Sequence, residues 1–245
     1  MIEYPHYFDG QTGVDGERLV ARRPDMVVMD AEPLLARGSR VLDVGAGYGA
    51  NGTHLALHGH IVHSVELNPD DLETGHRIIR ALGGLAASNT MVLGDMRDLS
   101  FFEEFDAVIT TRTLQLVTKP EAHQVIHKLR EATKPGGLNI INAYVAKPDE
   151  QAHMPNFAFF QPAELPRLYR QAGWAIKDDE SYYKMEDLAY APSGKPVNFS
   201  QERLIARKPT AARAEARRLL ISRAQIYRRS DPEHYDDLME QASAL

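Results

Sequence analysis

The stretch Val41-Leu-Asp-Val-Gly-Ala-Gly-Tyr-Gly49 joins an apolar run directly to three alternating glycines, Gly45, Gly47 and Gly49. An acidic residue, Glu66, ends the next apolar run. Glycine suits a sharp turn from strand to helix, because a ligand can approach a backbone that carries no Cβ atom. The pattern predicts a nucleotide-cofactor site at the first strand-to-helix turn of an α/β sheet.

Two kinds of cofactor are compatible with this loop. The segment Gly47-Tyr-Gly-Ala-Asn-Gly52 satisfies the G-x-G-x-x-G fingerprint, which favours a dinucleotide such as NAD. Asp43 argues against NAD, because its carboxylate would repel a pyrophosphate at close range. The same charge attracts S-adenosylmethionine, which carries an ammonium and a sulfonium but no phosphate. Glu66 does not discriminate, since it can accept the ribose hydroxyls of either cofactor.

A third acid, Asp95, follows another short apolar run and can accept a hydrogen bond from an adenine amino group. Taken singly, Asp43 is explained as a turn residue and Asp95 as a helix N-cap. Taken together, D-x-G-x-G-x-G at 43–49, Glu66, Gly94-Asp95-Met96 and Lys134-Pro-Gly-Gly-Leu138 resemble the class I S-adenosylmethionine-dependent methyltransferases over roughly residues 38–145.

This resemblance implies that Asp43 and the glycine backbone hold the methionine part, Glu66 the ribose, and Asp95 with Met96 the adenine. The product of the cofactor would be S-adenosylhomocysteine. The cofactor-binding residues expected on this basis are Asp43, Gly45, Ala46, Gly47, Gly49, Asn51, Glu66, Leu67, Asp95, Met96, Thr110 and Thr111.

A narrower resemblance covers the later part of the chain. Asn156-Phe-Ala-Phe-Phe-Gln-Pro-Ala-Glu164, Leu165, Trp174 and Glu202-Arg-Leu-Ile-Ala-Arg-Lys208 are similar to the tellurite-resistance (TehB-like) methyltransferases. This implies small, soft acceptors such as tellurite or selenium and sulfur compounds. It also implies a lid over the methyl group, built in part from Phe157, Phe159 and Phe160. The alternative for these phenylalanines is core packing.

Two departures from that family leave the substrate open. The chain extends past the family's short C-terminus, and Gly16-Glu-Arg-Leu-Val-Ala-Arg-Arg23 resembles the family's opening helix only loosely. We therefore expect three parts: an N-terminal cap segment at 1–38, the methyltransferase domain at 39–208 and a C-terminal helical extension at 209–245.

The composition is that of a globular enzyme with one substantial core, at 245 residues and 43% hydrophobic content. A net charge of −6 disfavours nucleic acid as a partner, and no apolar run reaches the roughly 20 residues of a membrane span. No signal-peptide pattern opens the chain, so a cytoplasmic location is expected. The absence of cysteine excludes disulfides, thiolate metal sites and a cysteine nucleophile.

Alternating hydrophobic periods predict a Rossmann-like α/β fold. The expected strands are 40–44, 61–66, 90–94, 105–110 and 137–144, and the expected helices are 50–58, 70–82, 120–133 and 161–173. Two later strands, 174–183 and 197–206, have no helix between them and should pair antiparallel. The result is the seven-stranded sheet that the resemblance implies, mostly parallel with the last strand antiparallel and with helices on both faces.

The extension at 209–245 predicts two helices of opposite charge, the first rich in arginine and the second in acids. Leu219, Leu220, Ala224 and Tyr227 give the first helix an apolar stripe. The stripe is explained by docking on the body, with the arginines in solvent, or by a dimer contact or an acidic partner. A monomer and a homodimer both remain open.

The acceptor side has fewer signals. Ile109-Thr-Thr-Arg-Thr-Leu-Gln-Leu116, after the fourth strand, lacks the Pro-Pro-aromatic turn of nucleic-acid amino-methylating enzymes. Arg112 suits an oxyanion or carboxylate, with a surface salt bridge as the alternative. His123 and His127 share one helix face, but no acidic or cysteine third ligand stands nearby with suitable spacing, so we expect a solvated face and no metal.

Methyl transfer to a soft, deprotonated nucleophile is an in-line displacement that needs alignment and no general base. An alcohol or phenol acceptor would need one, and the candidates are His123, Tyr144 and His153. Tyr7, Phe8 and Arg22 or Arg23 are expected to close the pocket from the N-terminal side. The catalytic candidates are thus Arg112, His123 and Tyr144, and the substrate-binding candidates Tyr7, Arg112, Phe157, Phe159 and Phe160.

The sequence therefore predicts a cytoplasmic S-adenosylmethionine-dependent methyltransferase that acts on a small molecule. Three alternatives stay open: a natural-product or metabolite O- or N-methyltransferase, an NAD-dependent oxidoreductase, and a non-catalytic module that binds the cofactor or a partner.

Overall fold

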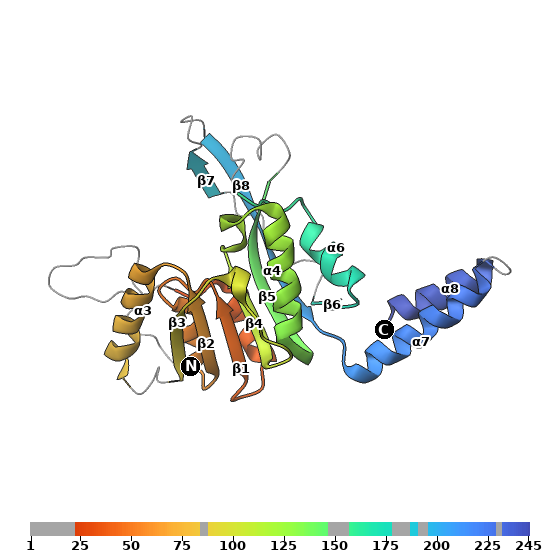
Figure 1. Ribbon diagram of the computed structural model, residues 1–245, viewed down its shortest axis with the longest axis horizontal. Coiled ribbons are helices and arrows are strands. Elements are labelled where there is room, and N and C mark those ends of the chain that lie inside the picture. The colour runs from red at the N-terminus through yellow and green to blue at the C-terminus, as the bar shows by residue number, and fades with distance from the viewer. Residues whose placement is uncertain (1–22, 84–87, 147–156, 178–186, 191–195, 229–231) are drawn as a thin grey trace.

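The computed structural model describes residues 23–83, 88–146, 157–177, 187–190, 196–228 and 232–245, and a mixed β-sheet lies at its centre (Figure 1). The strands follow the order β3-β2-β1-β4-β5-β8-β6. Their bounds are Arg40–Val44 for β1, Ile61–Glu66 for β2, Asn89–Leu93 for β3, Phe105–Thr111 for β4, Thr133–Val145 for β5, Ala175–Ile176 for β6 and Pro196–Arg207 for β8. The predicted seven-stranded mixed sheet is confirmed.

β8 is the strand that runs against its neighbours. The pairs β1–β2, β2–β3, β1–β4 and β4–β5 are parallel, whereas β8 is antiparallel to both β5 and β6. The sequence did not predict β7 (Asp187–Tyr190), which pairs antiparallel with β8. Within the predicted strand 174–183, β6 is the strand in the described part, and residues 178–183 lie outside the described residues.

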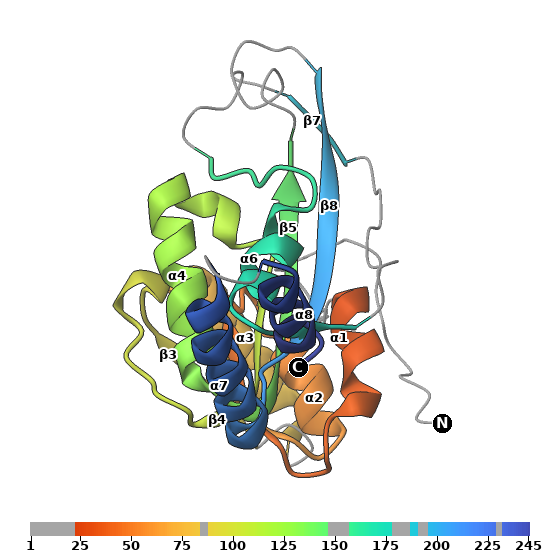
Figure 2. The same cartoon turned by 90° about the vertical axis from the view of Figure 1, so that its right-hand side faces the viewer.

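Helices cover both faces of the sheet because the buried strands alternate their side chains. Val41 of β1 packs in a cluster with residues of α1 and α2, and Leu42 packs in a second cluster with residues of α4 and α6. Figure 2 shows α1 and α4 on opposite sides of the central strands. The helices are α1 (Met26–Ala31), α2 (Ala50–Leu57), α3 (Pro69–Ala81), α4 (Lys119–Ala132), α6 (Glu164–Gln171), α7 (Ala211–Tyr227) and α8 (Pro232–Ser243).

The junction between α4 and β5 differs from the prediction. Lys134-Pro-Gly-Gly was expected to follow the helix as a loop, with the strand beginning at residue 137. Instead α4 ends at Ala132 and β5 begins at Thr133. Thr133 pairs with Phe105 across an irregularity in the β4–β5 register, and this pairing extends the strand backwards.

The N-terminal cap segment predicted at 1–38 is described from residue 23 onwards, and the part before it lies outside the described residues. Within the described part, the side chain of Asp25 caps α1 by accepting from the backbone N–H of Val27 at 3.1 Å. Val27 and Val28 are fully buried against the sheet. This part of the segment therefore belongs to the core.

The extension forms the two predicted helices, α7 and α8. They pack against each other, and Figure 1 shows the pair projecting away from the sheet. Among the described residues, no helix is both long and apolar enough to cross a membrane.

Candidate cofactor-binding site

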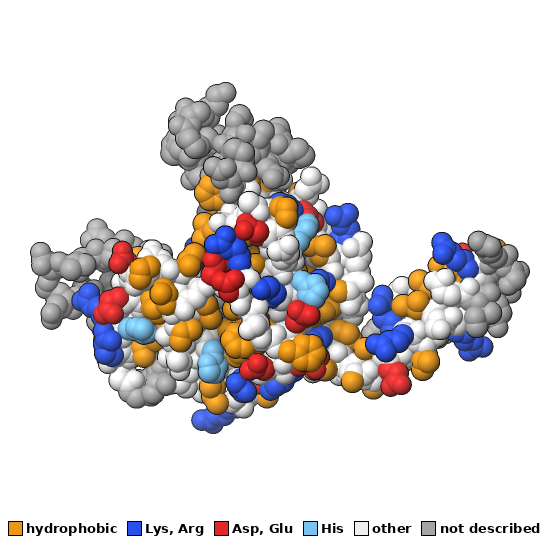
Figure 3. Space-filling model, viewed as in Figure 1, with side chains coloured by type: hydrophobic (Ala, Val, Ile, Leu, Met, Phe, Trp, Pro, Cys, Tyr) orange, Lys and Arg blue, Asp and Glu red, His pale blue; other side chains and the backbone are white. Residues whose placement is uncertain are grey.

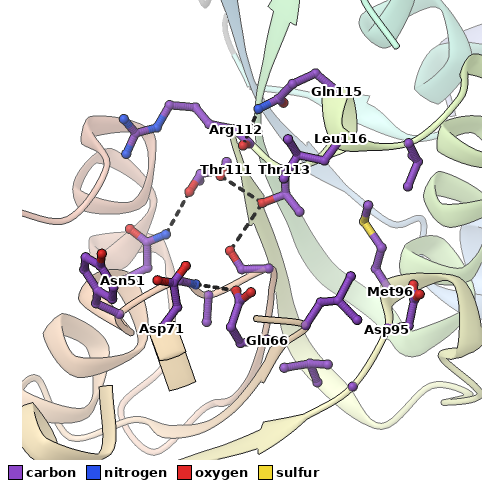
Figure 4. A pocket seen from close by; sticks show the side chains of 18 of the residues that line it. Asn51, Glu66, Asp71, Asp95, Met96, Thr111, Arg112, Thr113, Gln115 and Leu116 are labelled. Carbon is purple, nitrogen blue, oxygen red and sulfur yellow. Dashed lines mark hydrogen bonds between the residues drawn. The ribbon is translucent and has the colours of Figure 1, made fainter. Parts of the chain in front are cut away.

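A cavity of about 440 Å³ opens where β1, β2, β3 and β4 end (Figure 4). The carboxyl ends of parallel strands meet at this edge, which is where open α/β sheets bind ligands. Of the predicted cofactor residues, those that line the cavity are Gly45, Ala46, Gly47, Asn51, Glu66, Leu67, Asp95, Met96 and Thr111. Asp43, Gly49 and Thr110 lie behind this lining.

The glycine loop forms one wall of the cavity. Gly45 has a φ of +71°, and a Cβ atom there would overlap the side chain of Thr113. Gly47 has a φ of +55°, a conformation that residues with side chains rarely adopt. The Thr113 hydroxyl donates to the carbonyl of Gly45 at 3.3 Å. Glycine therefore lets the loop lie directly against the residues that follow β4.

Glu66, at the end of β2, is held in place by the backbone around it. Its Oε2 accepts from the N–H of Gly47 at 2.7 Å, and its Oε1 accepts from the N–H of Asn68 at 2.8 Å. A carboxylate has about four lone-pair positions, so capacity remains for two ligand hydroxyls. The side chain is oriented before a ligand binds.

Asp43 is buried beside the start of α2, with 1% of its surface exposed. Its Oδ2 accepts from the N–H of Gly52 at 3.2 Å, and its Oδ1 has no hydrogen-bond partner among the described residues. Burial raises the pKa of Asp43 to about 7, and the neighbouring Glu66 adds to the shift. A nearby cationic ligand group would offset this cost of burial.

Asp95 is committed to local contacts. It caps the short 3₁₀ turn Met96–Asp98 by accepting from the N–H of Arg97 at 2.8 Å. The Arg97 guanidinium donates to both of its oxygens, at 2.6 Å for the shortest contact, and this hydrogen bonding lowers the pKa of Asp95. Asp95 is therefore an N-cap, as one of the two interpretations of the sequence expected. An adenine amino group that bound to this carboxylate would share it with Arg97.

A polar network joins the end of β4 to α1 and α2. The Asn51 side chain donates to the Thr111 hydroxyl at 2.9 Å and accepts from the N–H of Asp25 at 2.9 Å. The Asp25 carboxylate accepts from Asn142 at 2.7 Å, and its Oδ2 lies 3.7 Å from Nε of Arg112. The N-terminal segment therefore positions both the cofactor wall and Arg112.

Arg112 has a strained backbone. Its φ is +54°, in the left-handed region, which costs of the order of 1 kcal/mol or more for a residue other than glycine. Its N–H donates to the carbonyl of Asn142 at 2.7 Å, and the Gln115 side chain donates to its carbonyl. These bonds fix the backbone of Arg112. Its half-exposed side chain lines the cavity and points away from Gln115 in Figure 4.

The remaining acceptor-side candidates separate into two groups. Tyr144 of β5 lines the cavity together with Arg112. His123 of α4 does not: its Nε2 lies 2.9 Å from Oε1 of Glu164, whose Oε2 accepts from Lys119 at 2.7 Å. His127 lies 3.3 Å from Glu131 on the same helix. The structure thus gives each of the two histidines its own acidic partner.

The phenylalanines predicted to form a lid lie away from the cavity wall. Phe159 and Phe160 are fully buried, and Phe160 belongs to the core cluster beneath α4 and α6. Phe157 is half-buried and stacks on Phe159. Core packing explains Phe160, whereas Phe159 is buried outside the two core clusters with Phe157 stacked on it, and the lid stays a prediction. Tyr7, Phe8, Arg22 and His153 lie outside the described residues, whereas Arg23 lines the cavity.

Sequence reasoning assigned no role to several residues of the cavity wall, among them Thr113, Gln115 and Asp71. Thr113 and Gln115 belong to a short turn after β4, and Asp71 comes from the first turn of α3. Gln115 is 7% exposed, and its Oε1 has no hydrogen-bond partner among the described residues. Their position in the sequence could have identified Thr113 and Gln115, because residues that directly follow a parallel strand lie at the edge of the sheet where ligands bind.

The strand order, the antiparallel β8, the glycine loop after β1 and the carboxylate at the end of β2 are together the fold and the cofactor loop that class I S-adenosylmethionine-dependent methyltransferases have. The chain belongs to the TehB family, because the family model "Tellurite resistance protein TehB" matches residues 22–187.

Individual relatives are more distant. The chain is 26% identical to Hemagglutinin 1 of Eikenella corrodens, over 69% of this chain and 55% of that protein. It is also 26% identical to the probable S-adenosyl-L-methionine-dependent methyltransferase TehB of Haemophilus influenzae, over 58% and 49% respectively. The chain spans about half the length of these relatives. The crystal structure of TehB from Haemophilus influenzae matches with a TM-score of 0.62 at 22% identity, over 75% of this chain and 62% of that one. This match shows a shared fold.

Proposed function

We propose that this chain transfers a methyl group from S-adenosylmethionine to a small, soft nucleophile such as tellurite or a selenium or sulfur compound. The observation that carries the proposal is Glu66, a buried carboxylate fixed by two backbone N–H groups on the wall of a cofactor-sized cavity. Membership of the TehB family supports the acceptor class.

The residues at the cavity suit S-adenosylmethionine. The spare lone pairs of Glu66 match the two ribose hydroxyls. The unpartnered oxygen of Asp43 supplies negative charge near the loop, which favours an ammonium or sulfonium and disfavours a pyrophosphate. Met96 offers an apolar surface to the adenine, with Asp95 beside it. NAD would gain nothing from Asp43, so S-adenosylmethionine is the better match.

When bound, the cofactor supplies an electrophilic methyl carbon, and the bonding electron pair stays on its sulfur when the methyl leaves. The chain's own residues align the reactants. Arg112 offers a fork of N–H donors to an oxyanion, and the network around Asp25 holds it at the wall. A deprotonated acceptor needs no general base, which agrees with the position of His123 on Glu164, away from the cavity.

The test is turnover by the full chain with S-adenosylmethionine and one acceptor at a time: tellurite, selenite, a thiol or a phenol. S-adenosylhomocysteine should form with tellurite, selenite or the thiol and not with the phenol. Turnover with the phenol alone would favour an O-methyltransferase. Cofactor binding without turnover of any acceptor would favour a non-catalytic module.

Arg112 gives the acceptor proposal a second test. Arg112→Ala should raise the KM for tellurite or selenite about tenfold or more, because it removes a charge-assisted contact to the oxyanion. The KM for a neutral thioether, which attacks through a sulfur lone pair and has no proton to lose, should change little, and Arg112→Lys should be intermediate. Equal losses for charged and neutral acceptors would contradict the assigned role.

A further inference from the structure

Charge is segregated along the C-terminal helices. α7 carries four arginines and one acid, whereas α8 carries four acids and neither lysine nor arginine. The arginines of α7 are Arg213, Arg217, Arg218 and Arg223, and the acids of α8 are Glu233, Asp236, Asp237 and Glu240. Each copy of the chain therefore presents one basic helix and one acidic helix side by side.

The charged side chains of α7 and α8 do not pair with each other across the contact between the two helices in the described part of the chain. Arg217 donates to the carbonyl of Ala242 at 3.2 Å. Among the described residues, no ion pair joins an arginine of α7 to an acid of α8. Arg218 and Arg223 are exposed, as are Asp236 and Asp237. In Figure 3, basic side chains stand out along this projecting pair of helices.

Among the side chains whose burial is described, the pair also buries little apolar surface. Those that are fully buried and apolar are Ala224, Leu238 and Ala242, and Leu219 on α7 is 64% exposed. Helices in proteins gain most of their stability from tertiary packing of an apolar face. The pair projects from the sheet (Figure 1), and among the described residues it meets the body where the Arg217 guanidinium lies against Gly173, just after α6. Much of its surface is therefore left for a partner to cover.

We propose that two copies of this chain dimerise through these helices, with α7 of one copy packed on α8 of the other. A two-fold arrangement brings each basic helix onto an acidic helix twice, since the same patch serves both copies. It also covers Leu219. The charge argues for a second copy over an anionic polymer or membrane, because the acids of α8 stand beside the arginines and would repel an anionic surface.

The experiment is sedimentation equilibrium of the full chain and of two charge-reversed variants. The unmodified chain should be a dimer at micromolar concentration. The first variant, Arg218→Glu with Arg223→Glu, makes α7 acidic like α8. The second variant, Asp236→Arg with Asp237→Arg, adds positive charge to α8, so that both of its helices carry arginines. Each variant alone should dissociate at least about tenfold more readily, because like charges then face each other across the interface.

Mixing the two variants gives the decisive readout. In a mixed pair, every acidic helix again faces a basic one, so dimers should reappear with one copy of each variant. Restoration on mixing would not occur if the substitutions had merely unfolded the helices of one chain. Arg77→Glu with Arg80→Glu on exposed α3 is the matched control and should leave the dimer intact. A monomeric unmodified chain, dimers unaffected by reversal, or a mixture that stays monomeric would each overturn the proposal.

Discussion

Glu66 connects three parts of the cofactor site through one side chain. It accepts from Gly47 in the glycine loop and from Asn68, and the Asn68 side chain in turn caps α3 by accepting from the N–H of Asp70 at 3.0 Å. Its orientation is therefore set by the backbone on both sides. A preorganised acceptor of this kind loses little freedom when a ligand binds.

Replacing Glu66 tests its role in cofactor binding. Glu66→Ala should weaken S-adenosylmethionine binding by about 1 to 3 kcal/mol, because the ribose hydroxyls lose their acceptor. Isothermal titration measures the change. Glu73→Ala, on the exposed side of α3, should bind like the unmodified chain. If Glu66→Ala binds S-adenosylmethionine as tightly as the unmodified chain does, then Glu66 does not bind the cofactor.

Asp43 makes cofactor binding depend on pH. Its pKa without ligand is about 7, so it is largely protonated below pH 7 and ionised above it. A cationic cofactor favours the ionised form, so affinity for S-adenosylmethionine should rise as the pH increases through 7 and then level off. Asp43→Asn should bind more weakly above pH 7, and its affinity should not vary through this range. An unmodified chain with pH-independent affinity would contradict this assignment.

At this scale the sequence predicts that Glu66 and Asp95 lie at the ligand edge, because spacing after an apolar run places a residue at a strand end. It does not predict Asp71, which comes from α3, or the partners of these acids. The pairing of Asp95 with Arg97, the burial of Asp43 and the left-handed backbone of Arg112 depend on three-dimensional packing, and no pattern in the sequence marks them.

Among the elements, β8 and α6 are joined by a buried carboxylate. Glu202 of β8 accepts from the N–H of Ala163, at the start of α6, at 3.1 Å. Its other oxygen has no partner among the described residues. Burial raises the pKa of Glu202 from its ordinary 4.5 to about 7.

This shift makes stability depend on pH. The unfolded chain ionises Glu202 near pH 4.5, whereas the folded chain holds the proton until about pH 7. The contribution of Glu202 is thus fully present below pH 4.5 and is lost as the pH rises through 7. In urea unfolding, the free energy of unfolding should therefore fall between pH 5 and 8 by roughly 2 kcal/mol less in Glu202→Gln than in the unmodified chain. Glu73→Gln is the exposed control, and an unchanged slope in Glu202→Gln would contradict the prediction.

The predicted bounds are confirmed for β1 and β2, which are largely buried strands with clear apolar runs. The antiparallel pairing of β6 with β8 is also confirmed, and it was predicted because the sequence shows no helix between these two strands. α1 was missed because its six residues are too few to show a helical period. β7 and the start of β5 were missed because strand pairing, a long-range interaction, decides them.

On the scale of the whole molecule, the cofactor cavity and the proposed dimer contact lie on different parts of the chain. The cavity is built on the sheet between β1 and β4, whereas the contact lies on α7 and α8, beyond β8. Dissociating the dimer by charge reversal should therefore leave S-adenosylmethionine affinity unchanged within about a factor of two, because distant sites act almost independently. Titration of either charge-reversed variant checks this, and a large loss of affinity would show that the two parts are coupled.

Binding of S-adenosylmethionine in the cavity is measured by isothermal titration of the full chain with S-adenosylmethionine, S-adenosylhomocysteine and NAD in parallel, before any acceptor is added. We expect micromolar binding of the first two and none of NAD, because the negative charge of Asp43 favours a cation and repels a pyrophosphate. Binding of NAD alone would show that the cavity is not a site for S-adenosylmethionine.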